Sequence, residues 1–444
     1  MRLGRILGIG VLLVAGCAVA AMLVILWRWN MPSAAALELA HVVEQRPPVP
    51  DADNGYIYLW GFTAAPEADV FRLGTERVAW LQKKLDDPDT ESKDPLEDEG
   101  DLAKRRSRAL RQLATLCRDE QWQECADSFD DWREADLIPW ESVKLARYRT
   151  LLGRSGWRET VSYFEGSPLA PFGDVLDGQR LRFLQLRGLA DAGKIDELRD
   201  ALDTDLRFWR LVFRNSDTLI TRMIAVAGVR QHFCFGNLLL RRLPPDRAAA
   251  AIPAGWTQPF TIDELSLLRT LAGELEFVQS AFRKAYAGDD GTLYDEDGEV
   301  VTGPEATLHQ WMSGIGKQLR PPQRQVNRYA ELQLAAARAF TVPVERYNAA
   351  AADIRARFPP SVVYPDISDY AFRSGSAEVM RRAALLTAQL RSVRTPAARM
   401  AEELRRATLR DPFTGEPFGW NASIQAVQFD PAGKYHSRAL SYLY

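Results

Sequence analysis

The sequence predicts a mainly α-helical protein that is held to a membrane by one N-terminal helix and that ends in a small β element. Three observations predict this fold class. An uncharged apolar segment lies near the N-terminus, apolar residues recur at helical spacing from residue 101 to about 408, and aromatic residues alternate between turn sequences after residue 411. We expect the helices to stack as antiparallel pairs, in the manner of an α-solenoid.

The N-terminal apolar segment, residues 6–27, reads "ILGIGVLLVAGCAVAAMLVILW" and contains no charge. About 20 apolar residues in a helix span the hydrocarbon core of a bilayer, whereas the apolar region of a cleaved signal has only roughly 7–15. The stretch "VAGC" that ends at Cys17 matches the box before a lipid-modified cysteine, but the apolar run continues to Trp27. The length therefore favours a permanent transmembrane anchor and leaves lipidation of Cys17 open.

The charges around this segment predict its orientation. Arg2 and Arg5 precede it, and few basic residues follow between Arg28 and Arg46. Because basic residues stay on the cytoplasmic side, we expect a cytoplasmic N-terminus and a periplasmic body on a single-pass protein of a bacterial inner membrane. The net charge of −3 argues against a nucleic-acid partner.

The chain divides into five predicted regions. They are a cytoplasmic stub and anchor at 1–30, a membrane-proximal segment at 31–100, a helical-hairpin domain at 101–290, a second helical region at 291–410, and a small β tail at 411–444. Within the membrane-proximal segment 31–100, "RPPVP" is a stiff spacer that we expect to lift the body from the membrane. The acidic stretch 86–101 is expected to be a solvated loop.

Several further local features are predicted from short stretches of the sequence. Ser33 is placed to cap a short helix, "DNGYIYLWGF" at 53–62 is a buried strand or helix, and 65–85 has helical spacing. Cys117 and Cys125 lie eight residues apart at a predicted helix corner, so we expect a disulfide between them in an oxidising compartment. Cys234 lies among aromatic residues and is predicted to be a core residue.

The clearest helix pair is at 180–213, "RLRFLQLRGLADAGKIDELRDALDTDLRFWRLVF". Gly193 is predicted to end its first helix, since glycine adopts the left-handed conformation that stops a helix. The hairpin resembles the helix pairs of tetratricopeptide-repeat proteins, and that resemblance implies α-solenoid packing. It covers this one hairpin, with a looser echo at 145–164, and no strict repeat of about 34 residues follows.

Further helices are predicted along the rest of the chain. Ser216 is expected to cap an apolar helix, and helices follow at 261–286, 305–316, 322–340, 342–357 and 376–408. A hairpin is expected at 292–303, and turns at Thr414–Gly415 and Pro431–Gly433 separate the strands of the tail.

No sequence motif identifies a catalytic residue, a metal or a cofactor. "GLADAGKI" places Ile195 where a phosphate loop needs Ser or Thr, so it is a helix-hairpin turn. "YDEDGE" at 294–299 lacks the ligand spacing of a calcium loop, and the four histidines form no zinc pair. His232, on an apolar helix, is expected to be a core histidine.

One polar cluster carries the candidate site. Asp217 with Thr221, and Thr218 with Arg222, are spaced i,i+4 at the start of an apolar helix. They predict a capping cluster in the first place, and otherwise a buried polar network or the lining of a polar groove.

These features favour a non-catalytic interaction protein of the cell envelope, either a scaffold or an inhibitor of the immunity-protein kind. Its expected partners are the membrane, through residues 6–27, and another envelope or periplasmic protein. The alternative is an enzyme that cleaves cell-wall glycan with a carboxylate pair assembled in space, which leaves no fixed sequence signature. The sequence leaves the oligomeric state open.

Overall fold

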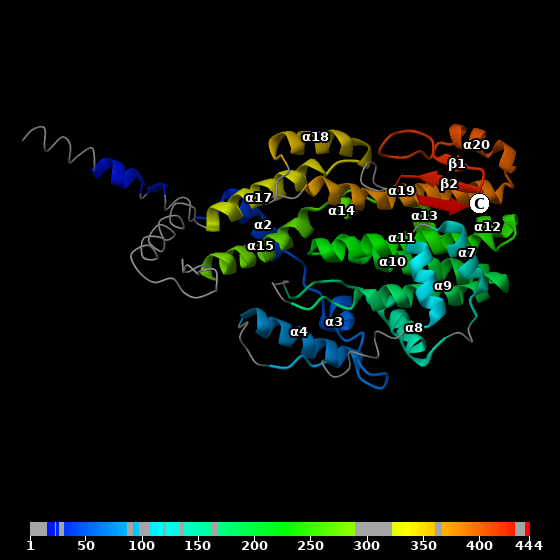
Figure 1. Cartoon of the computed structure of the whole chain (residues 1–444), viewed down its shortest axis with the longest axis horizontal. Helices are drawn as coiled ribbons and strands as arrows, with labels where there is room; N and C mark the ends of the chain where they lie inside the picture. The colour runs from blue at the N-terminus through cyan, green and yellow to red at the C-terminus, as the bar shows by residue number, and fades with distance from the viewer. Residues whose placement is uncertain are drawn as a thin grey trace, which may run out of the picture. The chain divides into compact units, whose positions relative to one another are not determined.

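The computed structural model describes residues 16–22, 24–25, 31–86, 92–96, 106–118, 121–133, 137–161, 167–288, 322–359, 366–430 and 440–444. The described chain is mainly helical and ends in a small antiparallel sheet, as predicted (Figure 1). It divides into unit 1, residues 1–46 with 271–335, and unit 2, residues 47–270 with 336–444. The predicted domain boundaries at residues 100, 290 and 410 stay predictions.

Some predicted elements lie outside the described residues. They are most of the apolar segment 6–27, most of the acidic loop, the hairpin at 292–303, the helix at 305–316 and the turn at Pro431–Gly433. In the apolar segment, residues 16–22 and 24–25 are described and are helical.

Unit 1 contains α2 (Ala34–Glu44), most of α15 (Leu268–Gly288) and most of α17 (Pro322–Ala339). The hydroxyl of Ser33 accepts a hydrogen bond from the Ala36 amide at 3.2 Å, which is the predicted cap. Proline cannot continue a helix, and "RPPVP" follows the end of α2.

Unit 2 begins with a turn of 3₁₀-helix at Asp51–Asp53 and with α3 (Gly55–Trp60), whose six residues are all buried. The apolar run at 53–62 is thus a helix and not a strand. It crosses α4 (Val70–Asp86) at backbone contact, because a Cβ atom at Gly74 would lie 2.1 Å from the carbonyl oxygen of Ile57.

The described part of the acidic loop, residues 92–96, packs on α4 and is not simply solvated. Arg77 pairs with Asp94 at 2.8 Å, and the indole of Trp80 donates to the carbonyl of Ser92 at 2.9 Å. Leu96 is buried with Ala64 and Leu73. The prediction missed this anchoring because a single leucine gives little signal among so many charges.

The predicted disulfide is confirmed. It joins Cys117 of α6 (Arg108–Arg118) to Cys125 of α7 (Trp122–Asp131), with Cα atoms 4.9 Å apart. α8 (Pro139–Leu152) follows. The looser helix pair expected at 145–164 does not continue after α8. Residues 154–160 are not helical, and Gly156 pairs with Asn54 in an isolated β-bridge.

The hairpin at 180–213 forms as α9 (Phe172–Asp191) and α10 (Ile195–Asn215). Gly193 has φ 65° and ends the first helix, as predicted. The amide of Lys194 bonds the carbonyl of Leu189 at 2.9 Å, which is the hydrogen bond of a Schellman motif.

The core of unit 2 is built around α11 (Leu219–Arg241) and α19 (Ile367–Ser392), which pack against each other (Figure 1). The cap of α11 is Thr218 and not Ser216, because the hydroxyl of Thr218 accepts from the amide of Thr221. Of the described helices, only α11 is long and apolar enough to span a membrane, and 67% of its most apolar stretch is buried inside the protein. That burial is typical of a core helix.

Shorter elements complete unit 2. They are α12 (Pro245–Ala251), α13 (Ala254–Thr257), α14 (Ile262–Leu265), α18 (Tyr347–Arg357), α20 (Met400–Arg406) and 3₁₀ turns at Val344–Arg346 and Ala397–Arg399. The helix predicted at 261–286 is broken between α14 and α15. The one predicted at 376–408 ends at Ser392, just before Arg394 adopts φ 54°.

The predicted small β element of the tail is a three-stranded sheet, in the order β1 (Gly419–Asn421), β2 (Ala426–Phe429), β3 (Leu440–Leu443). Its central strand pairs Val427 with Trp420 and Tyr442. The carbonyl of Leu443 accepts from the buried Arg391 at 2.7 Å and from Asn237 at 3.0 Å. The last strand is therefore fixed to α11 and α19.

The α3–α4 crossing generates a stability prediction. Gly74→Ala places a methyl group against the backbone of α3, so we expect a loss of about 3 kcal/mol or more in the free energy of unfolding. Gly188→Ala is the matched control, since a Cβ atom there meets nothing within 4 Å. It should be neutral or stabilise by about 0.5–1 kcal/mol. Denaturant unfolding measures both, and equal stability of the two variants would contradict the described crossing.

Candidate binding groove

A buried hydrogen-bond network occupies the centre of unit 2. The carboxylate of Asp205 accepts from the hydroxyl of Tyr148 at 2.5 Å, from Gln179 at 3.0 Å and from Nδ1 of His232 at 2.8 Å. The Nε2 atom of His232 accepts from the indole of Trp256 at 2.8 Å. Because an indole only donates, the imidazole is neutral with its proton on Nδ1. His232 is a core residue, as predicted, and has no ring nitrogen left for acid–base chemistry.

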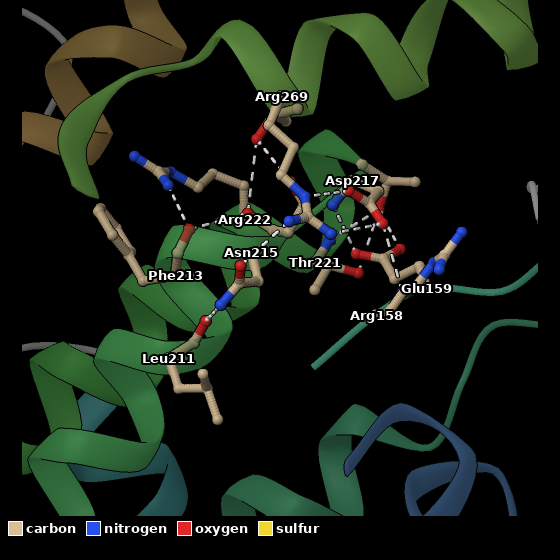
Figure 2. Close-up of polar contacts among 12 residues, drawn as sticks. Arg158, Glu159, Leu211, Phe213, Asn215, Asp217, Thr221, Arg222 and Arg269 are labelled. Carbon is tan, nitrogen blue, oxygen red and sulfur yellow. Dashed lines mark hydrogen bonds and ion pairs between the residues drawn. The ribbon is translucent and has the colours of Figure 1, made fainter. Parts of the chain in front are cut away.

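The four polar residues singled out in the sequence are all buried at the start of α11. Asp217, Thr218, Thr221 and Arg222 do not line the open groove described below. They split into two sets of contacts, and Figure 2 labels Asp217, Thr221 and Arg222 among them. Asp217, Thr218 and Thr221 face Glu159, whereas Arg222 points toward the end of α10.

The backbone amides of Glu159 and Asp217 each donate a hydrogen bond to the carboxyl group of the other residue. The amide of Asp217 donates to Oε1 of Glu159 at 2.8 Å, and the amide of Glu159 donates to Oδ2 of Asp217 at 3.3 Å. The Thr218 hydroxyl donates to Oε2 of Glu159 at 3.1 Å, and Nε of Arg269 donates to Oδ1 of Asp217 at 2.5 Å. Burial, and then the charge of Asp217, raise the pKa of Glu159 to about 8. The protonated form of Glu159 is therefore favoured relative to a carboxyl group in water.

Arg222 is fully buried and joins four helices. Its guanidinium donates to the carbonyl of Phe213 at the end of α10, to the carbonyl of Glu264 in α14 at 2.8 Å, and to the hydroxyl of Ser374 in α19 at 3.2 Å. It also lies over the Phe213 ring, 3.6 Å from the centroid. Burial lowers the pKa of Arg222 to about 9.

An open groove lies between α10 and the segment of α13 and α14, with a volume of about 790 Å³. Its charged lining residues are Asp203, Arg207, Arg210, Arg214, Asp263 and Glu264, and we call it the arginine groove. The three arginines are spaced i, i+3 and i+7, which places them along one face of α10. The spacing of the arginines can be recognised in the sequence. That Asp263 and Glu264 lie opposite them cannot, because these acids are distant in the chain.

The inner wall of the arginine groove is fixed by one ion pair. Arg210 donates from Nε and Nη2 to the two carboxylate oxygens of Glu264, both at 2.7 Å, and lies over the ring of Phe260. Burial alone would raise the pKa of Glu264, but hydrogen bonds from Arg210 and Thr261 outweigh it and lower the pKa. The backbone carbonyl of Glu264 also accepts a hydrogen bond from the buried Arg222.

The outer rim of the arginine groove is exposed and loosely paired. Arg214 pairs with Asp263 at 2.7 Å, and both side chains are more than half exposed, so the pair contributes little to stability. Arg207 donates to the hydroxyl of Thr204 at 3.1 Å and makes no ion pair with any residue that the structure describes. The carboxylate of Asp203 is held by the amides of Ala254 and Gly255. Arg207 and Arg214 are therefore the most exposed cationic groups of the arginine groove.

Comparison of the chain with protein-family models, curated proteins and solved structures finds no match to any of them. Within the described ranges, no group of three or more His, Cys, Asp or Glu side chains is placed to hold a metal ion. The arginine groove and the buried networks are therefore the features of the described chain that bear on its function.

The raised pKa of Glu159 predicts a pH dependence of stability. A carboxyl group whose folded pKa lies above its unfolded pKa binds more protons when folded, so stability falls as the pH rises from about 5 to 8. Glu159→Gln cannot ionise. The free energy of unfolding of the unaltered protein should thus fall relative to this variant, by at most about 1.4 kcal/mol per pH unit.

Denaturant unfolding at several pH values measures this difference, with Glu67→Gln, at an exposed carboxyl group, as the matched control. Parallel pH profiles of the unaltered protein and Glu159→Gln would contradict the raised pKa of Glu159.

The contacts of Arg222 predict a second stability effect. Arg222→Met leaves two buried carbonyl oxygens and one hydroxyl without this donor, and each such loss costs about 1–3 kcal/mol. We expect a total loss of about 3 kcal/mol or more, against a change within about 0.5 kcal/mol for Arg207→Met on the exposed face of α10. Thermal unfolding measures both. Similar melting temperatures for the two variants would show that Arg222 does not join the helices.

Proposed function

We propose that the chain is a membrane-anchored protein of the bacterial periplasm that binds another envelope protein through the arginine groove, as a scaffold or as an inhibitor. One contrast supports this proposal. The acids and the histidine that could do chemistry are buried and already hydrogen-bonded, whereas the arginines of the groove are presented in an open hollow. Exposed arginines are frequent in protein interfaces.

The proposed location rests on the sequence and on one covalent bond. Residues 6–27 are long enough to span a bilayer, and the basic residues before them favour a cytoplasmic N-terminus. A disulfide such as Cys117–Cys125 persists in oxidising compartments, and the periplasm is one. We therefore propose a single-pass protein of the inner membrane with its body in the periplasm.

The proposed architecture is α-solenoid-like, with a tetratricopeptide-like hairpin formed by α9 and α10. α11 packs on both helices of this hairpin, which is how a further helix continues such a stack. The arginine groove runs along α10, the second helix of the hairpin. Stacked helix pairs use surfaces of this kind to bind partner chains.

The alternative function, cleavage of cell-wall glycan, has one observation in its favour. A carboxyl group with a raised pKa beside a second carboxyl group, as at Glu159 and Asp217, resembles the carboxyl pair of glycosidases. However, Glu159 is 6% exposed and Asp217 is 3% exposed, and both carboxyl groups accept hydrogen bonds from the protein. A sugar chain would have to open this network to reach them, so we prefer the binding function.

Crosslinking in intact cells tests the proposal. The tagged full chain is crosslinked and captured, and the proteins that come with it are quantified by mass spectrometry. Arg207→Glu with Arg214→Glu reverses the charges at the groove rim, so we expect the dominant partner to fall by about tenfold or more. Arg405→Glu with Arg406→Glu, on an exposed part of α20, is the control and should leave capture unchanged.

Equal capture by both charge-reversed proteins would contradict the groove as the binding site. Retention of glycan fragments in place of a protein partner would favour the alternative function instead.

A further inference from the structure

A side-chain clamp fixes the residues that follow the apolar segment. The amide of Ser33 donates to Oδ1 of Asn327 at 2.8 Å, and Nδ2 of Asn327 donates to the carbonyl of Met31 at 2.8 Å. Both ends of one amide side chain are therefore used, and residues 31–33 are held on α17. Both partners belong to unit 1.

The clamp lies very close in sequence to the apolar segment. Only residues 28–30 separate Trp27 from Met31. A residue extends at most about 3.6 Å, so the four steps from Trp27 to Met31 cover at most about 14 Å. If residues 6–27 span the bilayer, the headgroup region already accounts for about 5–7 Å of that reach. The chain therefore cannot carry Asn327 far from the membrane surface.

The residues around the clamp have the composition of a membrane-binding surface. Arg324 and Arg328 are exposed, are spaced i,i+4 on one side of α17, and stand on either side of Asn327 in sequence. Met31 is 46% exposed, and Leu37, one turn after Ser33, is 59% exposed. Basic residues with exposed apolar ones are typical of segments that lie in the interface of an anionic bilayer.

The exposed acids of the same two helices come later in each of them. Glu38 follows Ser33 by five residues, and Glu331 follows Asn327 by four. On the N-terminal side of the clamp, the described residues next to it in these two helices include no acid.

We propose that unit 1 lies on the periplasmic leaflet of the membrane, with Arg324 and Arg328 at anionic phospholipid headgroups and with Met31 and Leu37 in the interface. This inference rests on the anchor of the proposed function. It changes the expected role of the proline-rich spacer, because Arg46–Pro50 follows the clamp and comes where unit 1 ends and unit 2 begins. The spacer then lies in the chain between residues of unit 1 and residues of unit 2, and it does not lift unit 1 from the membrane.

Photo-crosslinking to lipid tests this inference on the full chain. The protein is placed in nanodiscs of phosphatidylcholine with about 30% phosphatidylglycerol, and a photoreactive residue replaces Val19, Leu37, Arg324 or Arg405 in turn. Val19 reports on the anchor, and Arg405, exposed in unit 2, is the control. We expect lipid adducts at positions 19, 37 and 324, in yields about tenfold above position 405.

The outcomes separate the two proposals. Adducts at position 19 with none at 37 and 324 would overturn the surface contact and leave the anchor in place. No adduct at position 19 would overturn the anchor and, with it, the location in the proposed function. The yield at position 324 should also fall by about threefold or more in discs of phosphatidylcholine alone, and an unchanged yield would overturn the role of anionic lipid.

Discussion

The hydrogen bonds of one buried guanidinium, that of Arg222, are the interaction on which unit 2 depends. They reach backbone carbonyls at the end of α10 and in α14, and a hydroxyl in α19. Helix ends leave carbonyl groups without a helical partner, and a buried carbonyl without a donor is costly. Arg222 meets that need at the point where four helices come together. Because it bonds neutral groups and no carboxylate, its charge is held by dipoles, which explains why burial lowers its pKa.

Glu264 connects this buried interaction to the arginine groove. Its carbonyl accepts from Arg222 inside the protein, while its carboxylate accepts both ends of the Arg210 fork at the groove wall. The wall is therefore held in place before any partner binds, which reduces the entropy lost on binding. In the proposed binding function, the exposed Arg207 and Arg214 make the contacts that decide which partner is accepted. Rim charges of this kind chiefly affect association rate and specificity.

Local signals in the sequence predicted the local features of the fold. Gly193 stops α9, Cys117 and Cys125 pair, and the tail forms a small sheet, because each depends on residues close together in the chain. A buried polar network at the start of α11 was one of the alternatives predicted, but the partners in it are distant in the sequence and could not be predicted. Glu159 and Asp217 are 58 positions apart, and nothing near Glu159 indicates its partner. The predicted cap of α11, Ser216, was wrong for the same reason. Ser216 and Thr218 are both good caps, and tertiary packing decides between them in favour of Thr218.

Amide hydrogen exchange of the full chain, with and without the captured partner, tests whether the partner occupies the preformed groove between α10 and the segment 254–264. We expect slower exchange in peptides covering 203–214 and 254–264 when the partner is bound, with exchange elsewhere in unit 2 unchanged. Protection confined to other elements, with the groove peptides exchanging as before, would contradict it.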